Sequence, residues 1–244
     1  MQVGQRRRYR TAGRALHLFR EFLKEQTDPE SFYTALARDT IELVSRHEPL
    51  AGRTIVDVGA GTPQFCREFV AAGARYLAVD PEREALAPVP GSFGVVGVGE
   101  ELPLATGSAD IVMANNVMEH VRDPGVVGNE MLRVVRPGGL VFISYTSWSS
   151  PWGGHETSPW HWVGGDYAKA RYERRHGRPP KNRVGENMFP TRVDQGLDWA
   201  RNHPDAWLVE AIPRYHPDWA TWIITVPGLR EVMAWNHTMV LRHK

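Results

Sequence analysis

The sequence predicts an α/β fold with a mostly parallel seven-stranded sheet, helices on both faces and an antiparallel strand at the C-terminal edge. Two observations lead to this prediction. From residue 53 onward, short runs of continuous apolar residues alternate with segments of helical periodicity. Strands that are apolar on both sides are typical of parallel sheets covered by two layers of helices. The fraction of hydrophobic residues, 42%, is ordinary for a globular protein that builds such a core.

Seven apolar runs are the candidate strands. They cover residues 54–58, 76–80, 93–96, 110–114, 140–144, 207–212 and 238–241. The last run is expected to close the sheet as an edge strand. Glycine-rich or proline-rich turns separate the runs from the helices that follow or precede them.

The candidate helices begin before the first strand. Residues 1–50 have helical spacing of apolar residues, and Asp28-Pro29 supplies an N-cap with proline in the first turn. Further helices are expected at residues 65–72, from the fourth strand through Glu119, at about 129–135, at 194–202, and as two short helices within 219–235. The Arg136-Pro137-Gly138-Gly139 segment is predicted to end a helix and turn into the fifth strand.

We expect one domain with four parts: an N-terminal helical lid (1–50), a cofactor-binding core (54–145), an acceptor-side insertion (146–192) and the C-terminal part of the sheet (193–244). The insertion is irregular in pattern, and a loop this long is usually functional or disordered. Its tryptophans begin a crowded series that runs to Trp235. They form either a wall of an acceptor site or a packed lid.

Composition narrows the class of protein. The net charge of +1 gives no support to a nucleic-acid partner, and a single cysteine, Cys66, rules out an internal disulfide. No run of about 18 apolar residues is present, so we expect no transmembrane segment. A cytoplasmic location is the simplest expectation.

The turn after the first strand carries the main chemical signal. Gly59-Ala60-Gly61 follows a buried strand and precedes a helix, which lets backbone N–H groups approach a ligand closely. A dinucleotide site would need a third glycine where Gln64 stands. Asp57 lies just before the turn, and Asp80 ends the next strand, where a carboxylate can accept bonds from ribose hydroxyls. A charged amino acid moiety and a ribose without a diphosphate describe S-adenosylmethionine.

From about residue 54 to 145 the chain resembles the class I S-adenosylmethionine-dependent methyltransferases of the type 11 group, which have a Rossmann-like fold. Six motifs occur in the expected order and spacing. They are Asp57-Val58-Gly59-Ala60-Gly61-Thr62, Val79-Asp80-Pro81, Glu100-Glu101-Leu102-Pro103-Leu104, Ser108-Ala109-Asp110-Ile111-Val112, Met118-Glu119-His120-Val121 and Glu130-Met131-Leu132-Arg133-Val134-Val135-Arg136-Pro137-Gly138-Gly139. The flanking segments resemble an actinobacterial subgroup.

The resemblance implies roles for matching residues, with S-adenosylhomocysteine as product. The methionine part would lie against Asp57, Gly59, Ala60 and Gly61, the ribose against Asp80 and Pro81, the adenine along Gly99 and Glu100, and the methionyl amine near Asn115. One position departs from the pattern: Val98 stands where the family commonly has an aspartate that bonds the adenine amino group. Either a backbone carbonyl or Glu100 substitutes, or apolar contact holds the adenine. No metal ligand is assigned.

On the acceptor side, two histidines are candidate catalytic bases because the pKa of imidazole lies near neutrality. His155 follows the fifth strand and His120 follows the fourth, so both are expected at the edge where open α/β sheets bind ligands. Glu156 is a candidate to orient His155. The alternative is that each histidine only makes structural hydrogen bonds. The basic stretch from Lys169 to Arg183 is either a solvated surface or a docking site for an anionic acceptor.

These observations predict methyl transfer to a small-molecule acceptor, on a hydroxyl of a glycan, a glycolipid or a secondary metabolite. The alternatives are an RNA methyltransferase and a non-catalytic S-adenosylmethionine-binding partner protein. A nucleic-acid partner is not expected, peripheral contact with lipid stays open, and either a monomer or a homodimer is compatible with the sequence.

Overall fold

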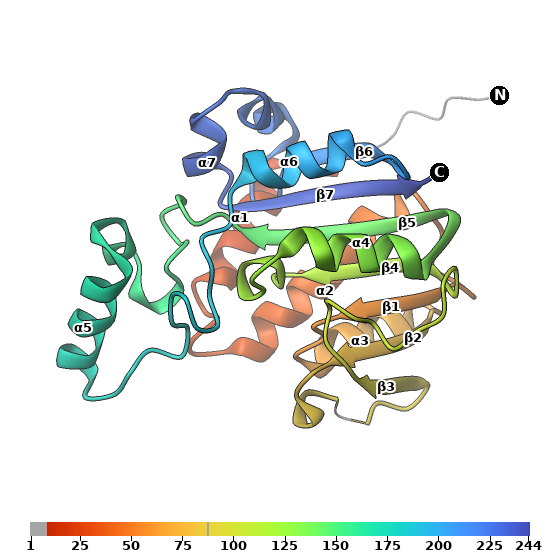
Figure 1. The fold of residues 1–244 in the computed structure, drawn as a ribbon, viewed down its shortest axis with the longest axis horizontal. Coiled ribbons are helices and arrows are strands. Elements are labelled where there is room, and N and C mark those ends of the chain that lie inside the picture. Colours follow the sequence, from red (N-terminus) through yellow and green to blue (C-terminus); the bar gives the residue numbers. More distant parts are fainter. Residues whose placement is uncertain (1–8, 87) are drawn as a thin grey trace.

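The computed structural model describes residues 9–86 and 88–244, and its centre is one seven-stranded sheet (Figure 1). The strand order is β3-β2-β1-β4-β5-β7-β6. The strands are β1 (Thr54–Val58), β2 (Arg75–Asp80), β3 (Ser92–Val96), β4 (Ala109–Asn115), β5 (Val135–Thr146), β6 (Ala206–Pro213) and β7 (Asn236–His243). β1 to β5 pair in parallel, and β7 pairs antiparallel with both β5 and β6. The predicted fold class is confirmed, although the edge strand is β6 and β7 is inserted beside it.

Two layers of helices cover the sheet, and each layer has its own apolar core. α4 (Pro124–Val134) and α6 (Val193–Asn202) lie on one face, while α1 (Ala12–Phe22), α2 (Pro29–Ser45) and α3 (Pro63–Ala71) lie on the other (Figure 1). The burial of β5 from Leu140 to Tyr145 reflects this double covering. Because β1 to β5 are parallel, their C-terminal ends meet at a single edge, and the loops that leave them converge there.

The N-terminal helices are confirmed, including the predicted cap. The carboxylate of Asp28 accepts a hydrogen bond from the backbone N–H of Ser31, and Pro29 opens α2. Residues 1–8, which include Arg6, Arg7 and Arg8, lie outside the described residues. Arg10 is buried and pairs with Asp218 at 3.0 Å, so it is part of the packed structure.

The helix predicted from the fourth strand through Glu119 is wrong. The chain makes only a 3₁₀ turn at Met118–His120, and the α-helix starts later, at Pro124. Asp123 explains the new start, since its carboxylate accepts the N–H groups of Gly125 and Val126 and proline occupies the first helical position. The 136–139 segment turns as predicted, with Gly138 at φ 73°, and forms a bulge at the start of β5.

The 146–192 insertion contains more helix than its sequence pattern suggests. After 3₁₀ turns at His155–Thr157 and Trp160–Val163, α5 (Gly165–His176) carries part of the basic stretch. α5 projects beyond the edge at which the parallel strands end (Figure 1). Residues 218–225 form 3₁₀ turns and α7 (Leu229–Met233) follows, which confirms the two short helices predicted on either side of Pro227. Within the described residues, we find no helix of the length and apolarity needed to cross a membrane.

One buried ion pair joins the N-terminal helices to the sheet. Arg214, which follows β6 and is fully buried, donates from Nε to Asp39 on α2 at 2.8 Å. Its other nitrogens reach the hydroxyl of Thr40 and the side-chain oxygen of Asn115 at the end of β4. Asp39 also accepts two bonds from Arg14 on α1. The pKa of Asp39 is lowered because the two neighbouring guanidinium groups outweigh its burial.

We predict that Arg214→Met strongly destabilises the protein, by about 3–5 kcal/mol, because it leaves the buried carboxylate of Asp39 with one guanidinium instead of two. Urea unfolding of the full chain measures the change. The control Arg175→Met lies on exposed α5 and should change the free energy of unfolding by less than about 0.5 kcal/mol. Equal effects of the two substitutions would contradict a structural role for this network.

Candidate active site

The turn between β1 and α3 has the geometry that its glycines predict. Gly59 and Gly61 have φ values of 70° and 55°, which side-chain-bearing residues rarely adopt. The N–H of Gly59 bonds the carbonyl of Val79 at 2.8 Å. A Cβ atom on Gly59 would lie 2.6 Å from Cγ2 of Val117, so the loop after β4 closes directly over this turn. The turn is therefore an open cradle on one side and tightly packed on the other.

Asp80 lies beside this cradle at the end of β2. Its carboxylate accepts the N–H of Gly61 at 3.0 Å and the N–H of Glu82 at 2.9 Å. These bonds fix the carboxylate between the two turns and leave further lone pairs for ribose hydroxyls. Pro81 follows in an exposed position.

Asp57 is fully buried under the turn. The hydroxyl of Tyr76 on β2 donates a hydrogen bond to its Oδ2. Burial raises the pKa of Asp57 to about 7, against the smaller opposing effect of that hydrogen bond. An ammonium group at the cradle would compensate the charge of this carboxylate, so Asp57 fits the methionine part of the cofactor.

The short loop that was predicted to lie along the adenine packs against α4. Glu130 on α4 accepts the N–H of Leu102 at 2.9 Å, and Gly99 is too close to Val127 and Val58 to carry a larger side chain without a shift. Val98 and Glu100 are exposed at this loop. The exposed Val98 side chain offers an apolar surface where the family commonly has a carboxylate.

The side-chain oxygen of Asn115 belongs to a buried network. It accepts bonds from Thr40, Ser144 and Arg214, while its Nδ2 has no hydrogen-bond partner among the described residues. The next residue, Asn116, has φ 55° and accepts a 2.7 Å bond from the amide of Asn236. Asn116 lines the cavity on the acceptor side, which the sequence did not indicate.

A cavity of about 190 Å³ lies beside Asn116. Aromatic side chains from four distant segments line it, together with three acidic or basic groups: Phe22, Phe32, Trp152, Tyr215, Glu25, Glu156 and His155. Trp152 packs edge-on against Phe22 and Trp235, so this tryptophan both packs and borders the cavity. The exposed Trp160 and Trp162 lie outside it, with Arg171 over the ring of Trp160.

The two candidate bases come together. The ring centroids of His120 and His155 are 5.3 Å apart, although 35 positions separate the two residues in the chain. Burial, and next the neighbouring His120, lower the pKa of His155 to about 4, so its imidazole is neutral at physiological pH. Its Nε2 is buried and makes no hydrogen bond to the described residues. His155 also has φ 49°, a strained conformation for histidine.

A third group, Glu119, belongs to the same cluster, and sequence reasoning did not single it out. Ligand atoms of Glu119, His120 and His155 all lie within 4.8 Å of one another. Glu119 is buried, and burial raises the pKa of its carboxyl. By contrast, Glu156 does not orient His155 here, because both its oxygens accept bonds from Asn182.

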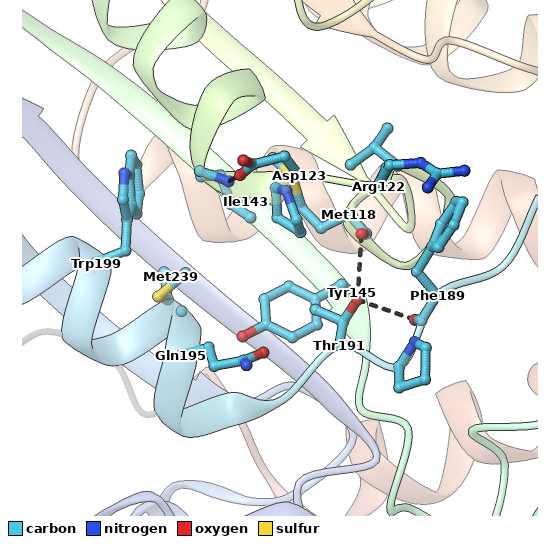
Figure 2. A pocket seen from close by; sticks show the side chains of 15 residues that line it. Met118, Arg122, Asp123, Ile143, Tyr145, Phe189, Thr191, Gln195, Trp199 and Met239 are labelled. Atoms are coloured by element: carbon cyan, nitrogen blue, oxygen red, sulfur yellow. Dashed lines mark hydrogen bonds between the residues drawn. The ribbon is translucent and has the colours of Figure 1, made fainter. Parts of the chain in front are cut away.

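A second cavity, of about 370 Å³, lies on the α4 and α6 side of the same loops (Figure 2). Met118, Tyr145, Phe189 and Trp199 supply apolar walls, and Arg122, Asp123 and Gln195 supply polar groups. The carboxylate of Asp123 already caps α4. No histidine lies among the described residues that line this cavity.

Comparisons with known proteins agree with this geometry. A family model described as "Methyltransferase domain" matches residues 56–143. An uncharacterized methyltransferase of Mycobacterium marinum is 48% identical over 95% of this chain and 94% of its own length. Another, of Mycobacteroides abscessus, is 45% identical over 95% of each chain.

Solved structures share the fold. An S-adenosylmethionine-dependent methyltransferase from Mesorhizobium loti matches 82% of this chain and 95% of its own, with a TM-score of 0.57 and 18% identity. One from Aquifex aeolicus matches 93% of this chain and 97% of its own, with a TM-score of 0.53 and 11% identity. The cofactor is S-adenosylmethionine, with S-adenosylhomocysteine as product, and the cradle at Gly59, the carboxylate of Asp57 and Asp80 fit it.

We predict that Gly59→Ala costs more stability than Gly177→Ala. Both positions have φ near 70°, so both substitutions carry the same backbone strain, of about 1–2 kcal/mol. Only Gly59 faces Val117, whereas Gly177 faces open space, and the steric clash adds about 1–3 kcal/mol. Urea unfolding compares them. The double variant Gly59→Ala with Val117→Ala should recover part of the loss, and no recovery would refute the assigned contact.

We predict that the ionisation of Asp57 weakens the fold as pH rises. Because the pKa is raised from 3.8 to about 7, the folded state holds this proton more tightly than the unfolded state. The free energy of unfolding should therefore fall as pH increases from about 4 to about 7 and then level off. Asp57→Asn cannot ionise. Between pH 5 and 8 the variant should gain about 2–3 kcal/mol relative to the natural chain, measured by urea unfolding at both pH values. A constant difference would contradict the raised pKa.

Proposed function

Because the chain belongs to the S-adenosylmethionine-dependent methyltransferase family, we propose that it methylates a hydroxyl group of a small-molecule acceptor, a glycan, a glycolipid or a secondary metabolite. A bound cofactor would supply a methyl group on a sulfonium; the acceptor oxygen would bond the methyl carbon in line as the carbon–sulfur bond breaks and S-adenosylhomocysteine leaves. The chain's own residues have to place the hydroxyl, exclude water and take up its proton.

The observation that carries this proposal is the position of the His155 cavity. Asn116, which follows β4 and is one residue from Val117 over the cofactor cradle, also lines the cavity. A group in the cavity is therefore next to the methionine end of the cofactor site. At about 190 Å³ the cavity is smaller than the roughly 300–1,000 Å³ of typical ligand sites. We infer that it encloses only the methylated end of a larger acceptor.

The lining favours a neutral, hydroxyl-bearing group. Trp152 and Tyr215 offer aromatic surface, Glu25 offers a carboxyl group that can bond hydroxyls, and Glu156, whose oxygens already bond Asn182, is a second acidic group. Burial raises the pKa of Glu25, which also accepts a bond from the hydroxyl of Tyr33 at 3.1 Å. Phosphates would meet these acidic groups, which argues against RNA and against an anionic reacting group. The basic side chains of α5 lie outside the cavity and are available only to distal parts of an acceptor.

We propose His155 as the group that activates the hydroxyl. It lines the cavity, it is neutral, and its buried Nε2 has no hydrogen-bond partner among the described residues. In the tautomer with the proton on Nδ1, Nε2 of His155 accepts the hydroxyl proton as the methyl group transfers. The ring of His120 lies beside that of His155, with centroids 5.3 Å apart, and we propose it as a positioning residue.

We predict that His155→Ala lowers kcat by at least about 100-fold, the usual loss when a general base is removed, while the affinity for S-adenosylhomocysteine stays within about threefold. Turnover is measured as S-adenosylhomocysteine release with a panel of glycans, glycolipids and hydroxylated metabolites. The affinity is measured by calorimetry.

The matched control is His203→Ala, at the end of α6, whose ring bonds Asn129 and lines neither cavity. It should leave turnover unchanged. Undiminished turnover of His155→Ala would reject the proposed base. Cofactor binding without methylation of any hydroxylated acceptor would favour the non-catalytic partner protein.

A further inference from the structure

The Glu119, His120 and His155 cluster has a property that base catalysis alone does not use. Each side chain offers one ligand atom, and the three atoms lie within 4.8 Å of one another at the edge where the parallel strands end. Two imidazoles and one carboxylate are a ligand set that proteins use for divalent transition ions. Such an ion, with bonds of about 2.0–2.1 Å, draws its ligands to about 3.3 Å apart, which small side-chain rotations achieve here.

The carboxylate of Glu119 lacks a counterpart for its charge. Its Oε1 accepts the backbone N–H of Thr146 at 2.9 Å, while Oε2 is buried and has no hydrogen-bond partner among the described residues. The side chain is 2% exposed, so water does not solvate the free oxygen. A buried carboxylate oxygen of this kind is costly unless a proton or a cation meets it.

Both imidazoles present a free lone pair. Nδ1 of His120 lies 2.9 Å from the backbone carbonyl oxygen of Asn187 and must donate to it, since a carbonyl only accepts. Nε2 is therefore the ring nitrogen of His120 that can offer a lone pair. The buried Nε2 of His155 has no partner within the described part of the chain. A hydrogen bond on the far nitrogen of a histidine is the usual outer support of a metal ligand.

The loop that carries Glu119 and His120 is held rigidly from the insertion. The N–H of Phe189 bonds the carbonyl of Glu119 at 2.8 Å, and the hydroxyl of Thr191 bonds the carbonyl of Met118. Figure 2 shows Thr191 between Met118 and Phe189, with dashed lines to both. Three contacts from residues 187–191 thus fix the ligand turn before any ion arrives, which is the preorganisation that a metal site needs.

From this geometry we infer that Glu119, His120 and His155 bind a divalent transition-metal ion of the Zn²⁺ class, with at least one coordination position open toward the His155 cavity. Three protein ligands and an open position are typical of catalytic rather than structural sites.

The catalytic consequence rests on the proposed function, whereas metal binding itself does not. An ion held by Glu119, His120 and His155 would act as a Lewis acid on an acceptor hydroxyl at its open position and lower the pKa of that hydroxyl. The hydroxyl proton would pass to water, the oxygen would bond the methyl carbon, and the carbon–sulfur bond would break to leave S-adenosylhomocysteine. The ion, instead of the imidazole of His155, would then activate the hydroxyl.

The test uses the full chain, freed of metal with EDTA and exchanged into buffer. Zn²⁺ is titrated by calorimetry, and Co²⁺ is titrated by its visible absorption, which reports the ligand geometry. We expect one ion per chain. Glu119→Gln and His155→Ala should each weaken binding by about 100-fold or more, since even outer-shell changes cost 10–100-fold. The control His203→Ala should bind as the natural chain does, and unchanged S-adenosylhomocysteine affinity shows that each variant is folded.

Absence of one-to-one binding, or binding that survives both substitutions, would overturn the inference. Neither result contradicts the proposed function. Hydroxyl methylation that requires His155 but continues in EDTA would support that function without a metal. Conversely, one-to-one binding without methylation of any hydroxylated acceptor supports the metal site and removes the proposed acceptor chemistry. Turnover that EDTA abolishes and Zn²⁺ or Co²⁺ restores supports both.

Discussion

The contact between Arg214 and Asp39 determines where the N-terminal helices lie. A fully buried guanidinium has to find acceptors for its N–H groups, and Arg214 finds them on α2 and at the end of β4. Arg14 brings α1 to the same carboxylate. Removal of Asp39 would leave the buried guanidinium of Arg214 without a carboxylate, and removal of Arg214 would leave Asp39 with Arg14 alone, so this network holds the helices over the sheet. That arrangement sets Phe22 and Phe32 as walls of the His155 cavity.

The cavity is therefore a product of tertiary structure. Phe22 comes from α1, Trp152 from the insertion and Trp235 from the segment before β7, yet the ring centroid of Trp152 lies 5.3 Å from that of Phe22 and 6.3 Å from that of Trp235. The network that secures this cluster also occupies the side chain of Asn115. The buried network thus contacts both the end of β4 and the helices that line the His155 cavity. We expect a substitution that loosens the N-terminal helices to alter this cavity more than the Gly59 turn.

Much of the fold was predictable from local patterns. A few neighbouring residues are enough to predict the apolar strands, the Asp28 cap and the Gly59 turn. The order of the motifs predicts which part of the chain binds the cofactor. The His155 cavity was harder to predict from the sequence. Nothing local shows that His120 and His155 meet, because their approach depends on the path of a long insertion. Glu119 was expected on a helix, and only the 3₁₀ turn that ends at His120 brings its carboxylate to the cluster.

Burial keeps the imidazole of His155 neutral and also makes it a weak base. An imidazole with a pKa of about 4 is available as a neutral lone pair at every physiological pH, but it binds a proton weakly. The same burial leaves Glu119 short of a positive partner. A divalent ion reverses both disadvantages, because it needs neutral imidazoles and an ionised carboxylate as ligands. It also acidifies the hydroxyl directly, so activation no longer depends on how strongly the imidazole holds a proton. A cation would therefore suit these three side chains, and the place of His155 in the wall of the cavity would give that cation a chemical role.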